Sequence, residues 1–125
     1  MTHPIVEALQ SREAEFIALR RRFHQQPEIG FQEHKTSAEV AKLLASWGYE
    51  VDYGLGGTGV AGTLKVGSGS KTLGLRADMD ALAMQERSGR TWSSETGGSL
   101  HDGGDDGHTT MLLGAAALLK VDPPQ

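Results

Sequence analysis

The stretch "SLHDGGDDGHTTMLLGAAALL", Ser99–Leu119, joins a loop rich in histidine and aspartate to an apolar run. The run predicts a helix over His108–Lys120, which the proline pair at 123–124 would end because proline cannot continue a helix. Apolar residues surround this helix almost completely, so we expect it to be buried. Gly114 and the neighbouring alanines would let it approach a sheet closely.

Two further helices are predicted nearer the amino terminus. Over Pro4–His24, apolar residues recur at helical spacing among charged ones, which is typical of an amphipathic surface helix. A second helix is predicted over Ser37–Trp47. Its start would be a capping box of Thr36 and Glu39, three residues apart, and Gly48 would end it.

Three short segments between these helices have the composition of strands. They are Tyr49–Tyr53, Val60–Val66 and Thr72–Asp78. The expected order is therefore two helices, three strands and a final helix. This order predicts the α/β class, with a small sheet and helices packed on it, in a single domain covering residues 1–125.

The composition limits the kinds of partner that we expect. The chain has 125 residues and a net charge of -4, without the basic excess that nucleic-acid or anionic-membrane binding usually requires. It contains no cysteine, so a metal would have to be bound by His, Asp or Glu. No apolar run approaches the roughly 20 residues of a membrane span, and no signal sequence is recognisable. We therefore expect a cytoplasmic protein that binds neither nucleic acid nor membrane.

One glycine-rich motif has the spacing of a dinucleotide-binding loop. "GLGGTG", Gly54–Gly59, matches G-x-G-x-x-G, but that chemistry requires a helix directly after the loop. The following "VAGTLKV" has the pattern of a strand instead. We therefore predict a hairpin turn between Val51 and Val60.

A second motif, "RADMD", follows the third predicted strand and covers Arg76–Asp80. Its carboxylates could bind a metal or orient a histidine ligand. Alternatively, Arg76 pairs with Asp78 while Asp80 caps the loop, and the residue types favour this structural interpretation.

The polar half of the opening stretch contains the candidate metal ligands, His101, Asp102, Asp105, Asp106 and His108. A calcium-binding EF-hand is excluded because required ligand positions hold glycine and leucine. Imidazole and carboxylate together suit zinc or another transition metal. Equally, one of the aspartates could cap the helix while the histidines are surface residues, and the spacing leaves both interpretations open. His3, His24 and His34 are expected to be solvated.

Four segments together resemble one enzyme family. They are "RRRFHQQPEIGFQEHKTSAEVAKLLASWGYEV", "GLGGTGVAGTL", "LGLRADMDAL" and "GHTTMLLGAAALL". The combination resembles the amino-terminal part of the M20 metallopeptidases, in the amidohydrolase branch of hippurate and N-acyl-amino-acid hydrolases. The resemblance implies an α/β catalytic domain with two divalent ions such as Zn, Mn, Co or Ni. A metal-activated water would attack the amide of an N-acyl amino acid, and a glutamate would transfer the proton.

The chain departs from the family at the metal loop. The family pattern is H-A-C-G-H-D-G-H, in which the cysteine and the histidine two residues later bind metal. The same positions here read "HDGGDDGH", so glycine stands at Gly103 and a carboxylate at Asp105. The family's adjacent glutamate pair and its lid and dimerisation domain correspond to sequence beyond Gln125.

These departures predict weak or no hydrolytic activity for the chain alone, as a partial catalytic domain. The alternative is a non-enzymatic remnant of the fold that binds a partner or self-associates, and we expect a homo-oligomer in either case. A hard cation held by the aspartates of the loop is a third possibility.

Overall fold

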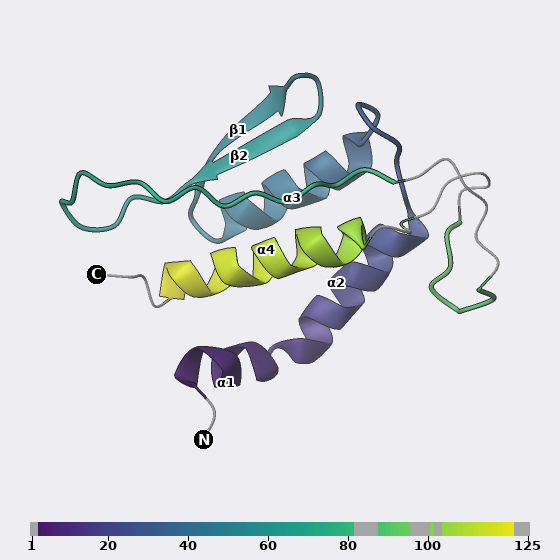
Figure 1. Ribbon diagram of the computed structural model, residues 1–125, viewed down its shortest axis with the longest axis horizontal. Helices are drawn as coiled ribbons and strands as arrows, with labels where there is room; N and C mark the ends of the chain where they lie inside the picture. Colours follow the sequence, from purple (N-terminus) through teal and green to yellow (C-terminus); the bar gives the residue numbers. More distant parts are fainter. Residues whose placement is uncertain (1–2, 82–87, 96–100, 102–103, 122–125) are drawn as a thin grey trace.

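The computed structural model describes residues 3–81, 88–95, 101 and 104–121 of the chain. Within these residues, four helices and one two-stranded antiparallel sheet follow one another (Figure 1). They are α1 (Pro4–Gln10), α2 (Glu13–Gln25), α3 (His34–Ser46), β1 (Glu50–Leu55), β2 (Gly59–Thr63) and α4 (Asp105–Val121). The predicted class, a small sheet with helices packed on it, is confirmed. Among the described residues, no helix is both long and apolar enough to cross a membrane.

The helix α4 lies at the centre of the molecule. It contacts α2 and α1 on one side and α3 on the other, while the hairpin of β1 and β2 packs on α3 (Figure 1). The core lies between these helices and consists of Leu19, Phe23, Val40, Leu44, Leu113 and Ala116. The Tyr49 hydroxyl joins the layers by donating a hydrogen bond to the Ala116 carbonyl at 2.7 Å.

The predicted buried helix begins three residues earlier than expected, at Asp105. Leu113 and Ala117 are each 2% exposed, but Met111 is 67% exposed, so one side of α4 faces outward. A Cβ atom at Gly114 would lie 3.6 Å from the Leu9 side chain. The sequence predicted that this glycine allows a close approach to a sheet. The close approach is made to the amino-terminal helices instead.

The prediction of a single helix over Pro4–His24 is wrong, because the segment forms two helices, α1 and α2. The Ser11 hydroxyl donates a hydrogen bond to the Ala8 carbonyl at 2.7 Å, and Arg12 leaves helical geometry with φ −113°. Serine side chains compete with backbone hydrogen bonds in this way at helix ends. The predicted amphipathic character holds for α2, which buries Leu19 and Phe23.

The predicted capping box is also wrong. The helix α3 starts at His34, two residues before Thr36, and its first amides bind a distant carboxylate. Glu28 Oε1 accepts the Thr36 amide at 2.7 Å, and Oε2 accepts the Lys35 amide at 3.0 Å. A carboxylate is favourable there because the amino end of a helix carries partial positive charge.

The carboxyl end of α3 was predicted correctly. Gly48 has φ +86°, in the left-handed region that glycine adopts without strain. The Tyr49 amide donates to the Leu44 carbonyl at 3.1 Å, and the Gly48 amide donates to the Ala45 carbonyl at 3.0 Å. These two bonds form the Schellman arrangement, which satisfies carbonyls that the helix itself leaves unbonded.

The hairpin prediction for "GLGGTG" is confirmed. Residues Glu50 and Thr63 pair at one end of the sheet and Leu55 and Gly59 at the other. A Cβ atom at Gly59 would lie 2.6 Å from the Leu55 carbonyl oxygen, so only glycine fits at the turn. No helix follows the turn, which rules out the dinucleotide-binding arrangement.

The predicted third strand over residues 72–78 does not form. The backbone from 64 to 80 has neither helix nor strand structure, and Ala81 makes only an isolated parallel bridge to Ile29. A strand requires a hydrogen-bonded neighbour, and no described segment pairs with residues 72–78. The apolar side chains of this segment are accordingly open to solvent, with Leu73 77% and Leu75 53% exposed.

Candidate metal site at the start of the last helix

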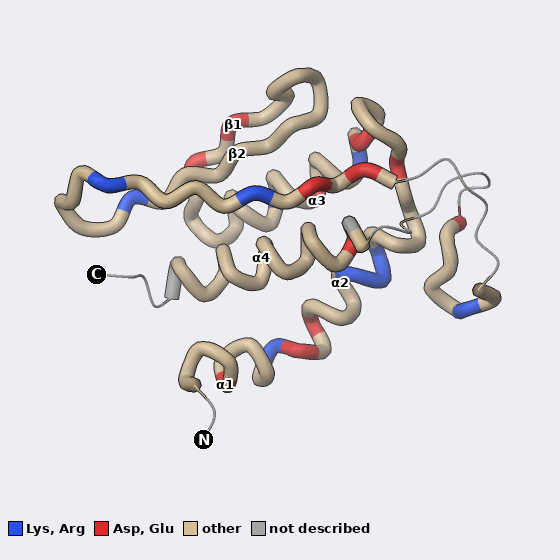
Figure 2. Tube along the Cα trace, in the orientation of Figure 1, with Lys and Arg blue, Asp and Glu red and all other residues tan. Residues whose placement is uncertain are grey.

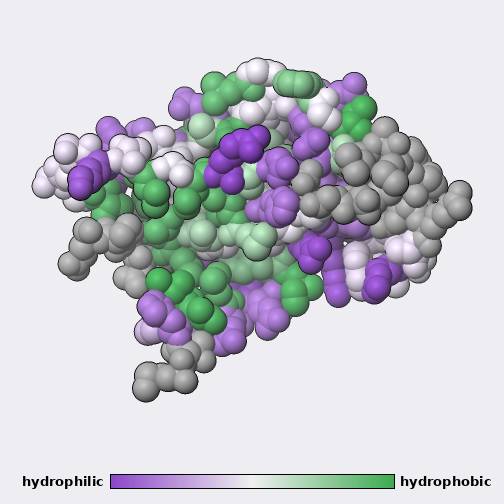
Figure 3. All heavy atoms as spheres, in the orientation of Figure 1, coloured by the Kyte–Doolittle hydropathy of each residue, from purple (hydrophilic) through white to green (hydrophobic). Residues whose placement is uncertain are grey.

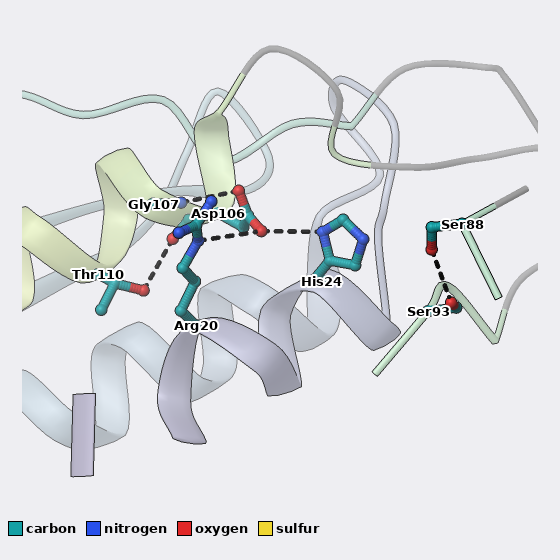
Figure 4. Close-up of polar contacts among 7 residues, drawn as sticks. All are labelled: Arg20, His24, Ser88, Ser93, Asp106, Gly107 and Thr110. Carbon is teal, nitrogen blue, oxygen red and sulfur yellow. Dashed lines mark hydrogen bonds and ion pairs between the residues drawn. The ribbon is translucent and has the colours of Figure 1, made fainter. Parts of the chain in front are cut away.

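The carboxylate of Asp106 is the most buried polar group at the start of α4, with 3% of the residue exposed. Its Oδ2 atom lies 2.9 Å from His24 Nδ1 and 3.5 Å from Arg20 Nε, both on α2 (Figure 4). Its Oδ1 atom accepts the Gly107 amide at 2.8 Å. Because an ionised carboxylate only accepts hydrogen bonds, His24 donates from Nδ1. Asp106 therefore joins α2 to α4.

His24 was expected to be solvated, and this expectation is wrong. Its side chain is 17% exposed and is fixed by the carboxylate of Asp106. The two residues are separated by 82 positions in the chain, so no local pattern could identify the pair. The only sequence signal was the position of His24 next to Phe23, which lies on the buried side of α2.

The buried histidine of the loop is His101, which is 5% exposed. Among the described residues, neither of its ring nitrogens makes a hydrogen bond of good geometry, although the Asp80 backbone lies close to the ring. Its ring centroid lies 6.5 Å from that of His24. Burial lowers the pKa of His101, and the negative charge of Asp106 and the backbone of Asp80 oppose this only in part. The ring is therefore neutral near pH 7, the form in which an imidazole can bind a metal.

His108 faces the "RADMD" motif. Its Nδ1 atom lies 3.0 Å from Asp78 Oδ1, and the Thr109 hydroxyl donates to the Asp78 carbonyl at 2.8 Å. Asp78 therefore binds a histidine of α4, and its pairing with Arg76 stays a prediction. The carboxylate–histidine pair matches the alternative, in which a carboxylate orients an imidazole.

A third carboxylate, Glu33, is buried but has a structural role. The residue is 7% exposed, and its Oε2 accepts the Thr58 hydroxyl at 2.5 Å. Its Oε1 accepts the Phe31 amide at 2.9 Å, where Phe31 has the positive φ of +63°. Glu33 thus holds the loop before α3 against the hairpin turn. Sequence reasoning did not identify it.

The structure describes the side chains of three of the five predicted ligands. Asp102 lies outside the described residues, and the structure describes only the backbone of Asp105. Of the other three, Asp106 binds His24 and His108 binds Asp78, whereas the ring nitrogens of His101 make no hydrogen bond of good geometry to a described residue. Metal binding by these five residues stays a prediction.

Several known proteins are similar to this chain, although no protein-family model matches it. Hippurate hydrolase of Campylobacter jejuni is 47% identical over 107 residues, which are 86% of this chain and 28% of that enzyme. An IAA-amino acid hydrolase of Arabidopsis thaliana is 46% identical over 83% of this chain and 23% of its own length. The crystal structure of a dinuclear metal-binding M20 peptidase from Bacillus subtilis superposes with a TM-score of 0.85 and 32% identity. That match covers 90% of this chain and 32% of the other.

The chain is similar to a portion of the peptidases of the M20 family. The sequence resemblance to its amidohydrolase branch is confirmed by these relatives. The chain spans about a quarter of the curated relatives and a third of the M20 crystal structure.

The described side chains do not fit a dinuclear M20 metal site. Within the described part of the chain, no three His, Cys, Asp or Glu residues lie close enough together to hold a metal ion. His101 supplies a buried ring nitrogen that could bind a metal and makes no hydrogen bond of good geometry to a described residue. Gly103, at the position of the family's cysteine ligand, has no side chain. We therefore derive no catalytic step through a metal.

Proposed function

We propose that this protein has the scaffold of an M20 amidohydrolase whose substrates are N-acyl amino acids of the hippurate class. The support is the similarity to hippurate hydrolase and to the IAA-amino acid hydrolase, at 47% and 46% identity. The neutral, buried His101 is a donor that could take part in binding a divalent ion such as Zn, Mn, Co or Ni. A cytoplasmic location and a single domain stay predictions.

We further propose that hydrolysis by the chain itself is weak or absent. The observation that carries this proposal is the loss of metal-binding side chains from the loop. Gly103 has no side chain to bind a metal, and Asp105 has a carboxylate where the family has the imidazole of a histidine. Losing a thiolate ligand weakens binding of zinc and similar ions, because sulfur is among their preferred donors. A hard cation bound by the aspartates of the loop would be a different site.

A second candidate function is a non-enzymatic module that self-associates. The observation that favours it is the exposure of Leu73, Leu75 and Met111, which are 77%, 53% and 67% exposed. Figure 3 shows hydrophobic residues gathered over the region of α4. Exposed apolar patches of this kind are typical of interfaces, and no segment that the structure describes pairs as a strand with residues 72–78.

One experiment separates the two candidate functions. Protein purified without chelator is analysed for bound metal, and hippurate hydrolysis is measured with added Zn, Mn, Co or Ni. We expect substoichiometric metal and no turnover above a buffer control. The double variant Gly103→Cys with Asp105→His should bind zinc more tightly, because it restores a thiolate and an imidazole. Metal-dependent turnover by the unaltered chain would refute the proposal of weak activity.

A further inference from the structure

A hollow of about 460 Å³ lies beside the His24–Asp106 pair, between α2 and residues 88–95. Its size is within the range of sites for small molecules. The loop is fixed to the end of α2 because the Gln25 carbonyl accepts the Glu95 amide at 2.7 Å. The Gln25 side chain also donates to the Thr91 carbonyl at 3.3 Å. The two walls of the hollow therefore have defined positions relative to each other.

The indole ring of Trp92 makes cation–π contacts with two arginines from two different segments. The guanidinium carbon of Arg21, on α2, lies 3.8 Å from the ring centroid, and that of Arg90, on the loop, lies 5.4 Å away. Figure 2 shows that both α2 and the segment 88–95 carry basic residues, drawn in blue. Each contact is favourable, but two like charges that lie close to one ring repel each other.

The described residues do not balance the positive charge of Arg21 and Arg90 with a carboxylate. Among the described residues, neither Arg21 nor Arg90 forms an ion pair with a carboxylate. The carboxylate that lines the hollow belongs to Asp106, and its Oδ2 atom is already shared by His24 and Arg20. A bound anion would offset the repulsion between the guanidinium groups.

The hollow also has an apolar wall. Ile17 from α2 and the ring of Trp92 line it together with the hydroxyl-bearing Ser88. An apolar surface beside two planar guanidinium groups suits a ligand with a flat charged group and an apolar body. Guanidinium binds carboxylate through two parallel hydrogen bonds, which fixes the direction of such a ligand.

We propose that this hollow binds a small organic anion, a carboxylate attached to an apolar or aromatic group. The carboxylate lies between Arg21 and Arg90, and the apolar body lies against Ile17 and Trp92. Inorganic phosphate would satisfy the charges but would leave the apolar wall uncovered. Because binding here requires no metal and no hydrolysis, this inference is independent of the proposed function.

Benzoate is the probe for this site, and the two tryptophans of the chain are the reporters. In a nitrogen–proton NMR titration with chelator present, we expect benzoate to shift the indole signal of Trp92 and to leave that of Trp47 unchanged. Arg21→Gln and Arg90→Gln should each weaken binding about tenfold, which corresponds to one charge-assisted contact. The matched control is Arg22→Gln, since Arg22 is on the same helix but pairs with Glu39 at 2.7 Å. It should change the Kd less than twofold.

Three results would overturn the inference. One is an equal shift with benzamide, which has the same ring but no charge. Another is binding of inorganic phosphate as tight as that of benzoate, because the apolar wall would then have no role. The third is unchanged benzoate affinity in both arginine variants. These variants alter different segments, so a folding defect in one leaves the other as a valid test.

Discussion

The Nδ1 atom of His24 lies 2.9 Å from Oδ2 of Asp106, and this contact joins the second helix of the chain to the start of the last one. The carboxylate is almost completely buried, so its charge depends on His24 and Arg20 for compensation. Removing one partner of a buried charged pair is strongly destabilising, because the other partner is left without compensation.

Asp106→Ala should therefore lower the free energy of unfolding by about 2–4 kcal/mol. Urea unfolding followed by circular dichroism measures this loss. The control is Asp52→Ala on β1, where the carboxylate is exposed and the expected change is within about 0.5 kcal/mol. Equal stability of the two variants would show that the contact between α2 and α4 contributes nothing.

Glu28→Ala tests the carboxylate that binds the first amides of α3. Two backbone amides, at 2.7 and 3.0 Å, lose their acceptor, so stability should fall by about 1–2 kcal/mol, as for the loss of an N-cap. Glu50→Ala removes an exposed carboxylate of β1 and is the control. If Glu28→Ala is as stable as this control, water replaces the carboxylate without cost.

His101→Leu tests whether the buried ring nitrogens lack partners. Because replacing an unpaired buried polar group by an apolar one is close to neutral, we expect less than about 1 kcal/mol of destabilisation in chelator-treated protein. For comparison, Leu113→Ala, at a site 2% exposed, should lose about 2–5 kcal/mol. A loss of that size for His101→Leu would mean that the ring is bound by a group outside the described residues or by water.

The pH dependence of Glu15 follows from its contact with Arg12. Hydrogen bonds from the Arg12 guanidinium, at 2.8 and 3.0 Å, lower the pKa of Glu15 below its ordinary value of 4.5. The contact therefore stabilises the fold above that pH, and the contribution is lost as pH falls through the lower pKa of the folded state. The Glu15 side chain is 51% exposed, so solvent screening keeps the effect at roughly 0.5 kcal/mol or less. The unfolding free energies of the unaltered chain and Glu15→Gln should differ at pH 7 and converge near pH 3.

Self-association is expected through the exposed apolar segment. Light scattering should detect dimers that dissociate on dilution, and Leu73→Ser with Leu75→Ser should weaken them at least tenfold. The control is Val6→Ser on α1, which is 44% exposed but lies on a different element. A monodisperse monomer at high concentration would contradict this expectation.

The sequence alone determined the features that depend on local chemistry. The hairpin at Gly54–Gly59 and the end of α3 at Gly48 follow from the freedom of glycine to adopt positive φ and to fit where a Cβ atom would clash. The resemblance to M20 peptidases was predicted from four motifs and is confirmed by the relatives.

Only the tertiary structure decided the contacts between distant residues. Glu28 replaces the predicted capping box because the loop before α3 brings its carboxylate to the helix, and His24 reaches Asp106 because α2 packs on α4. Periodicity cannot report either contact, since it describes only neighbours along the chain. The failed strand over residues 72–78 has the same physical reason, because an extended segment becomes a strand only where another segment supplies its hydrogen bonds.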